Sequence, residues 1–118
     1  MPHKTGADLI TEAKGRVREL TPEDARQKHG GDAVFLDVRE PNEWNLGHVP
    51  GATHIPRGTL ESKVEQQIPR DREVVIYCAT GNRSALAADT LQQMGYENVS
   101  SLAGGWRDWV QGGGAVEG

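Results

Sequence analysis

The sequence predicts an α/β fold of three layers, in which a mainly parallel central sheet of about five strands is flanked by helices. Short strand-like segments alternate with helical segments along the 118 residues. The two central strand segments, residues 33–38 and 73–77, are apolar on both faces, which is typical of parallel strands covered by helices on both sides. The length fits one domain of ordinary size.

The N-terminal part of the chain contains two expected helices with a short strand between them. Apolar residues share one helical face over residues 7–14, and residues 17–20 suit a short strand. The second helix begins after Thr21, whose hydroxyl can cap the first turn, and Pro22 and two acidic residues follow it. This helix is expected to end at the glycine pair 30–31.

The middle of the chain alternates between strand, loop and helix. Residues 33–38 form an apolar run that is too short for a helix, so a buried strand is expected there. Residues 41–56 are rich in loop-forming residues, with a short strand expected around 52–55. Apolar residues then recur at every fourth position over residues 60–68, which predicts an amphipathic helix ended by Pro69.

The last part of the chain contains the clearest buried strand, over residues 73–77, and a further strand over 99–102. Helices are expected over 84–94, where Gly95 ends the helix, and over 105–110. In open parallel sheets, ligands bind beyond the carboxyl ends of the strands. The expected carboxyl ends of the two central strands carry charged or reactive residues, so a site is expected there.

Three parts make up the expected domain organisation. Residues 1–16 form an N-terminal helical extension, and residues 17–111 form the folded domain. The glycine-rich residues 112–118 are expected to be a flexible tail, since low complexity occurs only at this end of the sequence.

Composition narrows the classes of partner. The chain has 13 lysines and arginines against 17 acidic residues and a net charge of −4, which argues against a nucleic-acid-binding protein. Its single cysteine cannot form an intrachain disulfide. The longest apolar run, residues 74–79, is far shorter than a membrane span, and the first residues lack the apolar core of a signal peptide. A cytoplasmic protein without a nucleic-acid or membrane partner is therefore expected.

The functional prediction depends on Cys78, which follows the apolar strand and precedes a helix. The loop that joins the two, with the first helical residue, consists of Ala79, Thr80, Gly81, Asn82, Arg83 and Ser84. Such a loop can turn its N–H groups inward, and the helix adds unpaired N–H groups and the positive end of its dipole. This arrangement can hold an anion and stabilise a thiolate. The alternative for a lone cysteine is a small buried apolar residue, and Arg83 can pair with an anionic substrate or with a structural carboxylate.

Three further residues, Asp37, Arg39 and His48, are expected to support this loop. The first two follow the other central strand, where they can act electrostatically on the loop or form a structural ion pair that ties Arg39 to Glu43 or another acid. His48 can be a general base, but we favour a role in pinning its own loop by hydrogen bonds. The remaining histidines lack a second ligand at a useful spacing, so no metal site is predicted.

These residues resemble the rhodanese-like domain family, the sulfurtransferases. Residues 78–84, Cys-Ala-Thr-Gly-Asn-Arg-Ser, are similar to the family's active-site loop. Residues 36–40 resemble its strand ending in Asp-x-Arg, residues 43–56 its Glu-aromatic-x-x-Gly-His-Ile-Pro-Gly-Ala segment, and residues 102–109 its closing Gly-Gly-Trp signature. The motifs occur in the expected order and together cover about residues 17–110.

The resemblance implies a rhodanese-like fold and the chemistry of a single-domain thiosulfate sulfurtransferase. Cys78, as a thiolate, would attack the sulfane sulfur of a donor such as thiosulfate, and sulfite would leave. The Cys78 persulfide would then pass its outer sulfur to cyanide or to a thiol, and a thiol protein is a further acceptor class. The loop amides would hold the donor and the persulfide, and no metal or organic cofactor is implied.

Three alternative functions stay open. The fold can serve as a non-enzymatic interaction module, although many such modules have lost the cysteine, or as a persulfide carrier for another enzyme. Phosphatases and arsenate reductases that resemble this family have a loop one residue longer, which encloses a tetrahedral oxyanion. Four residues lie between Cys78 and Arg83, so the shorter loop favours a single sulfur atom. The thiosulfate enzymes also carry cationic side chains just after the cysteine, whereas this loop has only Arg83.

Overall fold

A computed structural model, which describes residues 2–118, contains a five-stranded sheet in which every strand pairing is parallel. The strands are β1 (Arg18–Leu20), β2 (Val34–Asp37), β3 (Thr53–His54), β4 (Val74–Tyr77) and β5 (Val99–Leu102). Their order across the sheet is β1-β5-β4-β2-β3. The prediction of a mainly parallel sheet of about five strands is therefore confirmed.

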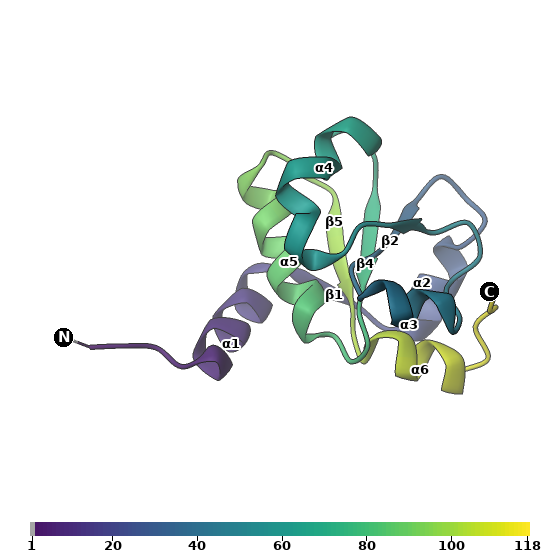
Figure 1. Ribbon diagram of the computed structural model, residues 1–118, viewed down its shortest axis with the longest axis horizontal. Coiled ribbons are helices and arrows are strands. Elements are labelled where there is room, and N and C mark those ends of the chain that lie inside the picture. The colour runs from purple at the N-terminus through teal and green to yellow at the C-terminus, as the bar shows by residue number, and fades with distance from the viewer. Residues whose placement is uncertain (1) are drawn as a thin grey trace.

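The helices of the described residues are α1 (Gly6–Arg16), α2 (Pro22–Lys28), α3 (Pro41–Asn45), α4 (Leu60–Gln67), α5 (Asn82–Gln93) and α6 (Gly105–Gln111), with a 3-10 turn, η1, at Arg57–Thr59. Helices α4 and α5 cover one face of the sheet, and α2 and α6 cover the other, which gives the expected three layers (Figure 1). Helix α1 lies beside α5, and the chain before it extends away from the domain (Figure 1). Within residues 2–118, no helix has the length and apolar character that crossing a membrane requires.

The helix boundaries follow the capping residues. Thr21 accepts a hydrogen bond of 3.1 Å from the N–H of Asp24, as its position before Pro22 predicts. Helix α5 starts at Asn82, before the predicted residue 84, because Gly81 adopts a positive φ of 104° and acts as its N-cap. Helix α3 lies in the segment for which the sequence predicts only loop and a short strand. Its five residues are too few to show a helical period.

Strand alternation decides which face of the sheet each central side chain occupies. Along β4, Val74, Ile76 and then Cys78 belong to the apolar cluster under α4 and α5. Val75 and Tyr77 belong to the cluster under α2 and α6. The side chain of Cys78 therefore lies on the α5 side of the sheet, where the loop that follows it begins this helix.

Residues 112–118 lie back against the domain. The indole N–H of Trp109 donates to the carbonyl of Ala115 at 2.8 Å. The backbones of His48 and Glu117 exchange two hydrogen bonds, of 2.8 and 2.9 Å, in an antiparallel bridge. This segment thus contacts the loop that contains His48, and the flexibility expected for it stays a prediction.

Candidate active site

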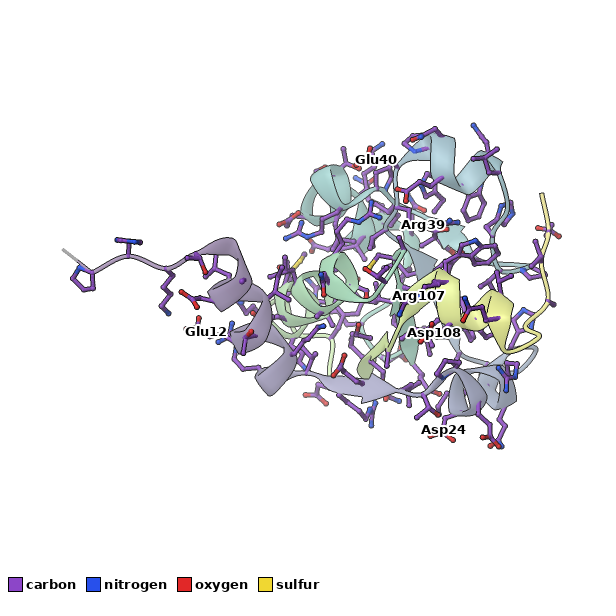
Figure 2. All side chains as sticks on the ribbon, turned by 90° about the horizontal axis from the view of Figure 1, so that it is seen from below. Glu12, Asp24, Arg39, Glu40, Arg107 and Asp108 are labelled. Atoms are coloured by element: carbon purple, nitrogen blue, oxygen red, sulfur yellow. The ribbon has the colours of Figure 1, made fainter. Side chains whose placement is uncertain are left out.

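Cys78 is the first residue after β4 and lies at the carboxyl edge of the sheet. Figure 2 looks onto this end of the molecule, with Arg39 and Arg107 in the middle of the view. The N-termini of two helices meet the loop here, because α5 continues it and α6 lies across its start. The N–H of Trp106 donates to the carbonyl of Cys78 at 2.8 Å, and the N–H of Arg107 donates to the carbonyl of Ala79 at 3.1 Å. Helix α6 therefore fixes the backbone from which the thiol projects.

The sulfur of Cys78 is surrounded by hydrogen-bond donors from its own loop. The N–H of Gly81 donates to Sγ at 3.1 Å and the N–H of Ser84 at 3.4 Å, while the Ser84 hydroxyl oxygen lies 3.5 Å from Sγ. The residue is only 1% exposed. The loop therefore closes around the Cys78 sulfur itself, and its role in binding an anion stays a prediction.

Two opposing effects act on the pKa of the Cys78 thiol. Burial raises it, because a charged sulfur is poorly solvated inside the protein. The hydroxyl and N–H of Ser84, with the N–H groups of Gly81 and Thr80, lower it by donating to the thiolate. The hydrogen bonds outweigh burial, so the pKa lies below its ordinary value and the ionised, nucleophilic form is favoured.

A second serine, Ser101 of β5, completes the surroundings of the sulfur. Its hydroxyl oxygen lies 2.8 Å from that of Ser84, and both residues are fully buried. Ser84 has one hydroxyl proton, so when it donates to a Cys78 thiolate, the Ser101 hydroxyl must donate to Ser84. Sequence reasoning missed Ser101. The available signal was a pair of polar residues, Ser100 and Ser101, inside a short strand that should be buried.

Glycines allow the close approach between the loop and α6. Gly105 has a φ of +58°, and a Cβ on it would lie 2.5 Å from the carbonyl oxygen of Cys78 and 2.7 Å from the carbonyl carbon of Ala79. Those distances are shorter than a side chain tolerates. Only glycine fits there, because it has neither a Cβ nor a penalty for positive φ. The glycine pair that the sequence motif contains is thus required by packing against the Cys78 loop.

Arg83 does not lie unpaired at the loop. Its two terminal nitrogens donate to the two carboxylate oxygens of Glu43 at 2.9 and 3.1 Å. Arg83 lowers the pKa of Glu43 to about 2, against the desolvation that burial imposes, so the carboxylate is charged at neutral pH. Of the two partners that the sequence allows for Arg83, the structure contains the carboxylate.

Asp37 and Arg39 form a buried ion pair on the other face of the sheet. Both residues are almost inaccessible, at 0% and 3% exposure, and their shortest side-chain contact is 2.8 Å. Arg39 also donates to the carbonyl of Gly47 at 2.7 Å and lies 4.8 Å from the Trp106 ring. The carboxylate that pairs with Arg39 is therefore Asp37 rather than Glu43. Arg39 links β2 to the loop before His48.

His48 makes contacts that hold its own loop. Its Nδ1 lies 3.0 Å from the carbonyl oxygen of Trp44, its Nε2 lies 3.2 Å from a carboxylate oxygen of Glu117, and its ring stacks on Trp44 with 3.5 Å between centroids. Among the hydrogen bonds of residues 2–118, none joins Asp37, Arg39 or His48 to Cys78. No cluster of three possible metal ligands occurs in the same range.

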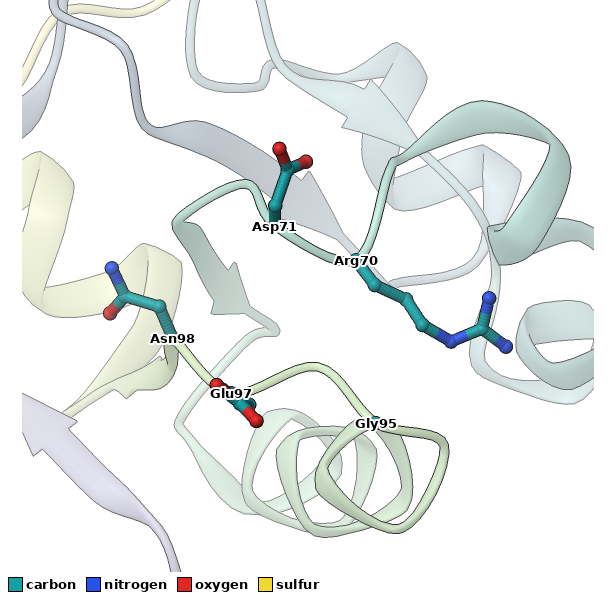
Figure 3. A pocket seen from close by; sticks show the side chains of 5 residues that line it. All are labelled: Arg70, Asp71, Gly95, Glu97 and Asn98. Carbon is teal, nitrogen blue, oxygen red and sulfur yellow. The ribbon is translucent and has the colours of Figure 1, made fainter.

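A separate hollow lies at the opposite edge of the sheet, beside the segments that lead into β4 and β5. Figure 3 shows the residues that line it, which are Arg70, Asp71, Gly95, Glu97 and Asn98. Its volume is about 370 Å³. Ligands of parallel sheets bind at the carboxyl edge, and this hollow lies at the amino edge, so we place the candidate site at Cys78.

Comparison with known proteins shows the family to which the chain belongs. A model of the family described as "Rhodanese-like domain" matches residues 21–112. "Putative sulfur carrier protein YrkF" of Bacillus subtilis is 34% identical over 109 residues, which cover 91% of this chain and 58% of that protein. The chain therefore spans less than two thirds of the length of this curated relative.

Two solved structures are similar over most of the chain. One is a protein of unknown function from Rhodopseudomonas palustris, described as a "Possible Tyrosine Phosphatase", with 36% identity, a TM-score of 0.89 and 99% of both chains covered. The other is the polysulfide-sulfur transferase homodimer of Wolinella succinogenes, with 29% identity, a TM-score of 0.79, and 92% of this chain and 83% of that chain covered. With its fold, its loop and the family match over residues 21–112, the chain belongs to the rhodanese-like domain family of sulfurtransferases and sulfur carriers.

Proposed function

We propose that this protein is a sulfurtransferase that moves a sulfane sulfur from a donor such as thiosulfate to a thiophilic acceptor through a persulfide on Cys78. One observation carries the proposal: the buried Cys78 sulfur accepts hydrogen bonds from Gly81 and Ser84, which favour its thiolate. The acceptor is cyanide in an assay, and a small thiol or a thiol protein otherwise.

The reaction would take place in two displacements at sulfur. The Cys78 thiolate attacks the outer sulfur of thiosulfate, the S–S bond of the donor breaks, and sulfite leaves with the bonding electron pair. The persulfide then gives its outer sulfur to the acceptor and the Cys78 thiolate returns. A thiolate that is already ionised needs no general base, and the ring nitrogens of His48 contact Trp44 and Glu117 rather than Sγ. The N–H groups of the loop support the negative charge at each stage.

A persulfide carrier is the second candidate, and the curated relative named as a sulfur carrier favours it. The same loop would hold the same persulfide, and only the acceptor would differ. A carrier would gain sulfur readily but release it slowly to cyanide. The solved relative named as a polysulfide-sulfur transferase favours the enzyme.

The phosphatase description of the Rhodopseudomonas relative is less suited to this loop. A phosphate ester needs room for a tetrahedral group between the thiolate and the loop amides. Here Gly81 and Ser84 contact the sulfur directly at 3.1 to 3.5 Å, and the residue is 1% exposed. Arg83, which would bind the phosphate oxygens, is paired with Glu43.

The test measures the intact mass of the protein before thiosulfate, after it, and again after cyanide, beside Cys78→Ala. We expect a gain of one sulfur atom in the wild type, its removal by cyanide with release of thiocyanate, and no gain in the variant. A carrier would gain the sulfur and lose it only slowly to cyanide. Sulfur transfer that persists in Cys78→Ala would refute the proposal.

A further inference from the structure

The charge of Arg83 is already compensated before any substrate arrives. Arg83 is the only lysine or arginine among residues 78–84. Its guanidinium and the Glu43 carboxylate form a two-pronged pair at 2.9 and 3.1 Å, the geometry in which such pairs are strongest. The two side chains are 34% and 28% exposed, so they lie at the rim of the site rather than free in solvent.

Glu43 is held in this place from its own side as well. It occupies the first turn of α3, and its Oε1 accepts the N–H of Glu40 at 3.0 Å in addition to the Arg83 contact. Arg83 in turn is close enough to Cys78 for a thiolate there to raise the Arg83 pKa, although Glu43 has the larger effect. The carboxylate therefore adds a fixed negative charge next to the only cation of the loop.

This negative charge acts differently on donors of different charge. Thiosulfate has two negative charges. The second charge would either pair with the Arg83 guanidinium or have no cationic partner in the loop. Using Arg83 would displace the Glu43 carboxylate and leave two anions facing each other. A donor with one negative charge on the sulfane end can be held by the loop N–H groups alone, without disturbing the pair.

We propose that Glu43 is a specificity-determining residue. It makes the site react more slowly with dianionic sulfur donors than with donors that carry a single negative charge. The proposal rests on the proposed sulfurtransferase function and names the charge class of its donor. Glu43 would act through Arg83 and would not touch the transferred sulfur. Its effect should therefore depend on the charge of the donor.

Two simple sulfur donors allow the effect of donor charge to be measured by itself. Thiosulfate and methanethiosulfonate carry the same kind of sulfane sulfur, with two charges and one charge respectively. The Cys78 thiolate takes the outer sulfur from each, the S–S bond breaks, and the electron pair leaves on sulfite in the first case and on methanesulfinate in the second. No oxidant or reductant is needed, because only a sulfur atom is transferred.

The experiment measures the second-order rate constant of persulfide formation with each donor, followed by intact mass, for the wild type and Glu43→Gln. We expect the wild type to prefer methanethiosulfonate, and Glu43→Gln to raise the thiosulfate rate relative to the methanethiosulfonate rate by about tenfold. An effect of about this size is expected from removing one charge beside Arg83 in a partly solvated site. Arg83→Gln should change the ratio in the opposite direction, because it leaves Glu43 unpaired.

A matched control is Glu61→Gln. Glu61 also pairs with an arginine, Arg57, at 3.0 Å, but on α4, so the variant removes the same charge elsewhere. The donor ratio should not change. A ratio that is equal in the wild type and Glu43→Gln, or that shifts equally in Glu61→Gln, overturns the role of Glu43. If the wild type gains sulfur from neither donor while Cys78 is intact, the sulfurtransferase function itself fails.

Discussion

Removal of the Ser84 hydroxyl tests whether hydrogen bonds keep Cys78 ionised. Ser84→Ala deletes the oxygen that lies 3.5 Å from Sγ and keeps the N–H groups of Gly81 and Ser84, at 3.1 and 3.4 Å. It also removes the hydroxyl that contacts Ser101 at 2.8 Å. The variant thus removes one side-chain hydrogen bond to the sulfur and retains the two backbone hydrogen bonds.

The size of the effect follows from the strength of one hydrogen bond to a charged acceptor. Such bonds contribute about 1.5–3 kcal/mol, and the 3.5 Å contact is long, so a value at the low end, about 1.5 kcal/mol, is expected. Since one pKa unit corresponds to roughly 1.4 kcal/mol, the pKa of Cys78 should rise by about one unit. At a pH below the wild-type pKa, the thiolate fraction should fall about tenfold. The rate of persulfide formation should fall about threefold, because a thiolate of higher pKa is a stronger nucleophile.

Thiolate absorbance in the ultraviolet against pH measures this directly, with Cys78→Ala as the blank. The matched control is Ser100→Ala, because Ser100 is also buried on β5 but pairs with Arg18 at 2.8 Å, away from the sulfur. Ser101→Ala should give a smaller rise than Ser84→Ala, because Ser101 acts only through Ser84. An unchanged titration in Ser84→Ala, or an equal rise in Ser100→Ala, would refute the hydrogen-bond explanation.

The remaining predictions concern stability. Asp37→Asn leaves Arg39 buried without its anion, so the free energy of unfolding in urea should fall by about 3 kcal/mol, whereas Glu61→Gln on the surface should cost less than about 1 kcal/mol. Gly105→Ala places a Cβ 2.5 Å from the Cys78 carbonyl oxygen at a positive φ and should cost about 2–4 kcal/mol; a variant as stable as the wild type would contradict the close packing. Glu43 has a folded pKa of about 2 against an ordinary 4.5, so its pair with Arg83 adds stability that is fully present above about pH 5 and is lost as the pH falls toward 2. Partial exposure reduces its value to about 1–2 kcal/mol, so the stability difference between wild type and Glu43→Gln should shrink between pH 6 and pH 3 in urea titrations.

The hydrophobic pattern of the sequence predicted the buried strands and the helix that follows Cys78. The apolar segments 33–38 and 73–77 became β2 and β4, and the loop after Cys78 leads into α5 as expected. The same patterns could not predict which charged groups pair, because pairing depends on neighbours that the fold brings together. Arg83 meets Glu43 across 40 residues of sequence. Ser101 reaches Ser84 only because β5 lies beside β4 in the sheet.

The structure separates the reactivity of the sulfur from the choice of its donor. The groups that lower the pKa of Cys78 most are the hydroxyl of Ser84 and the backbone N–H groups of the loop, which are uncharged. The cation at the rim, Arg83, is compensated by Glu43 and acts on the charge of whatever approaches. If the two roles are separate, Ser84→Ala should slow sulfur uptake from both donors by the same factor, whereas Glu43→Gln should change only their ratio. A change of the donor ratio in Ser84→Ala would show that the loop around Cys78 itself selects the donor.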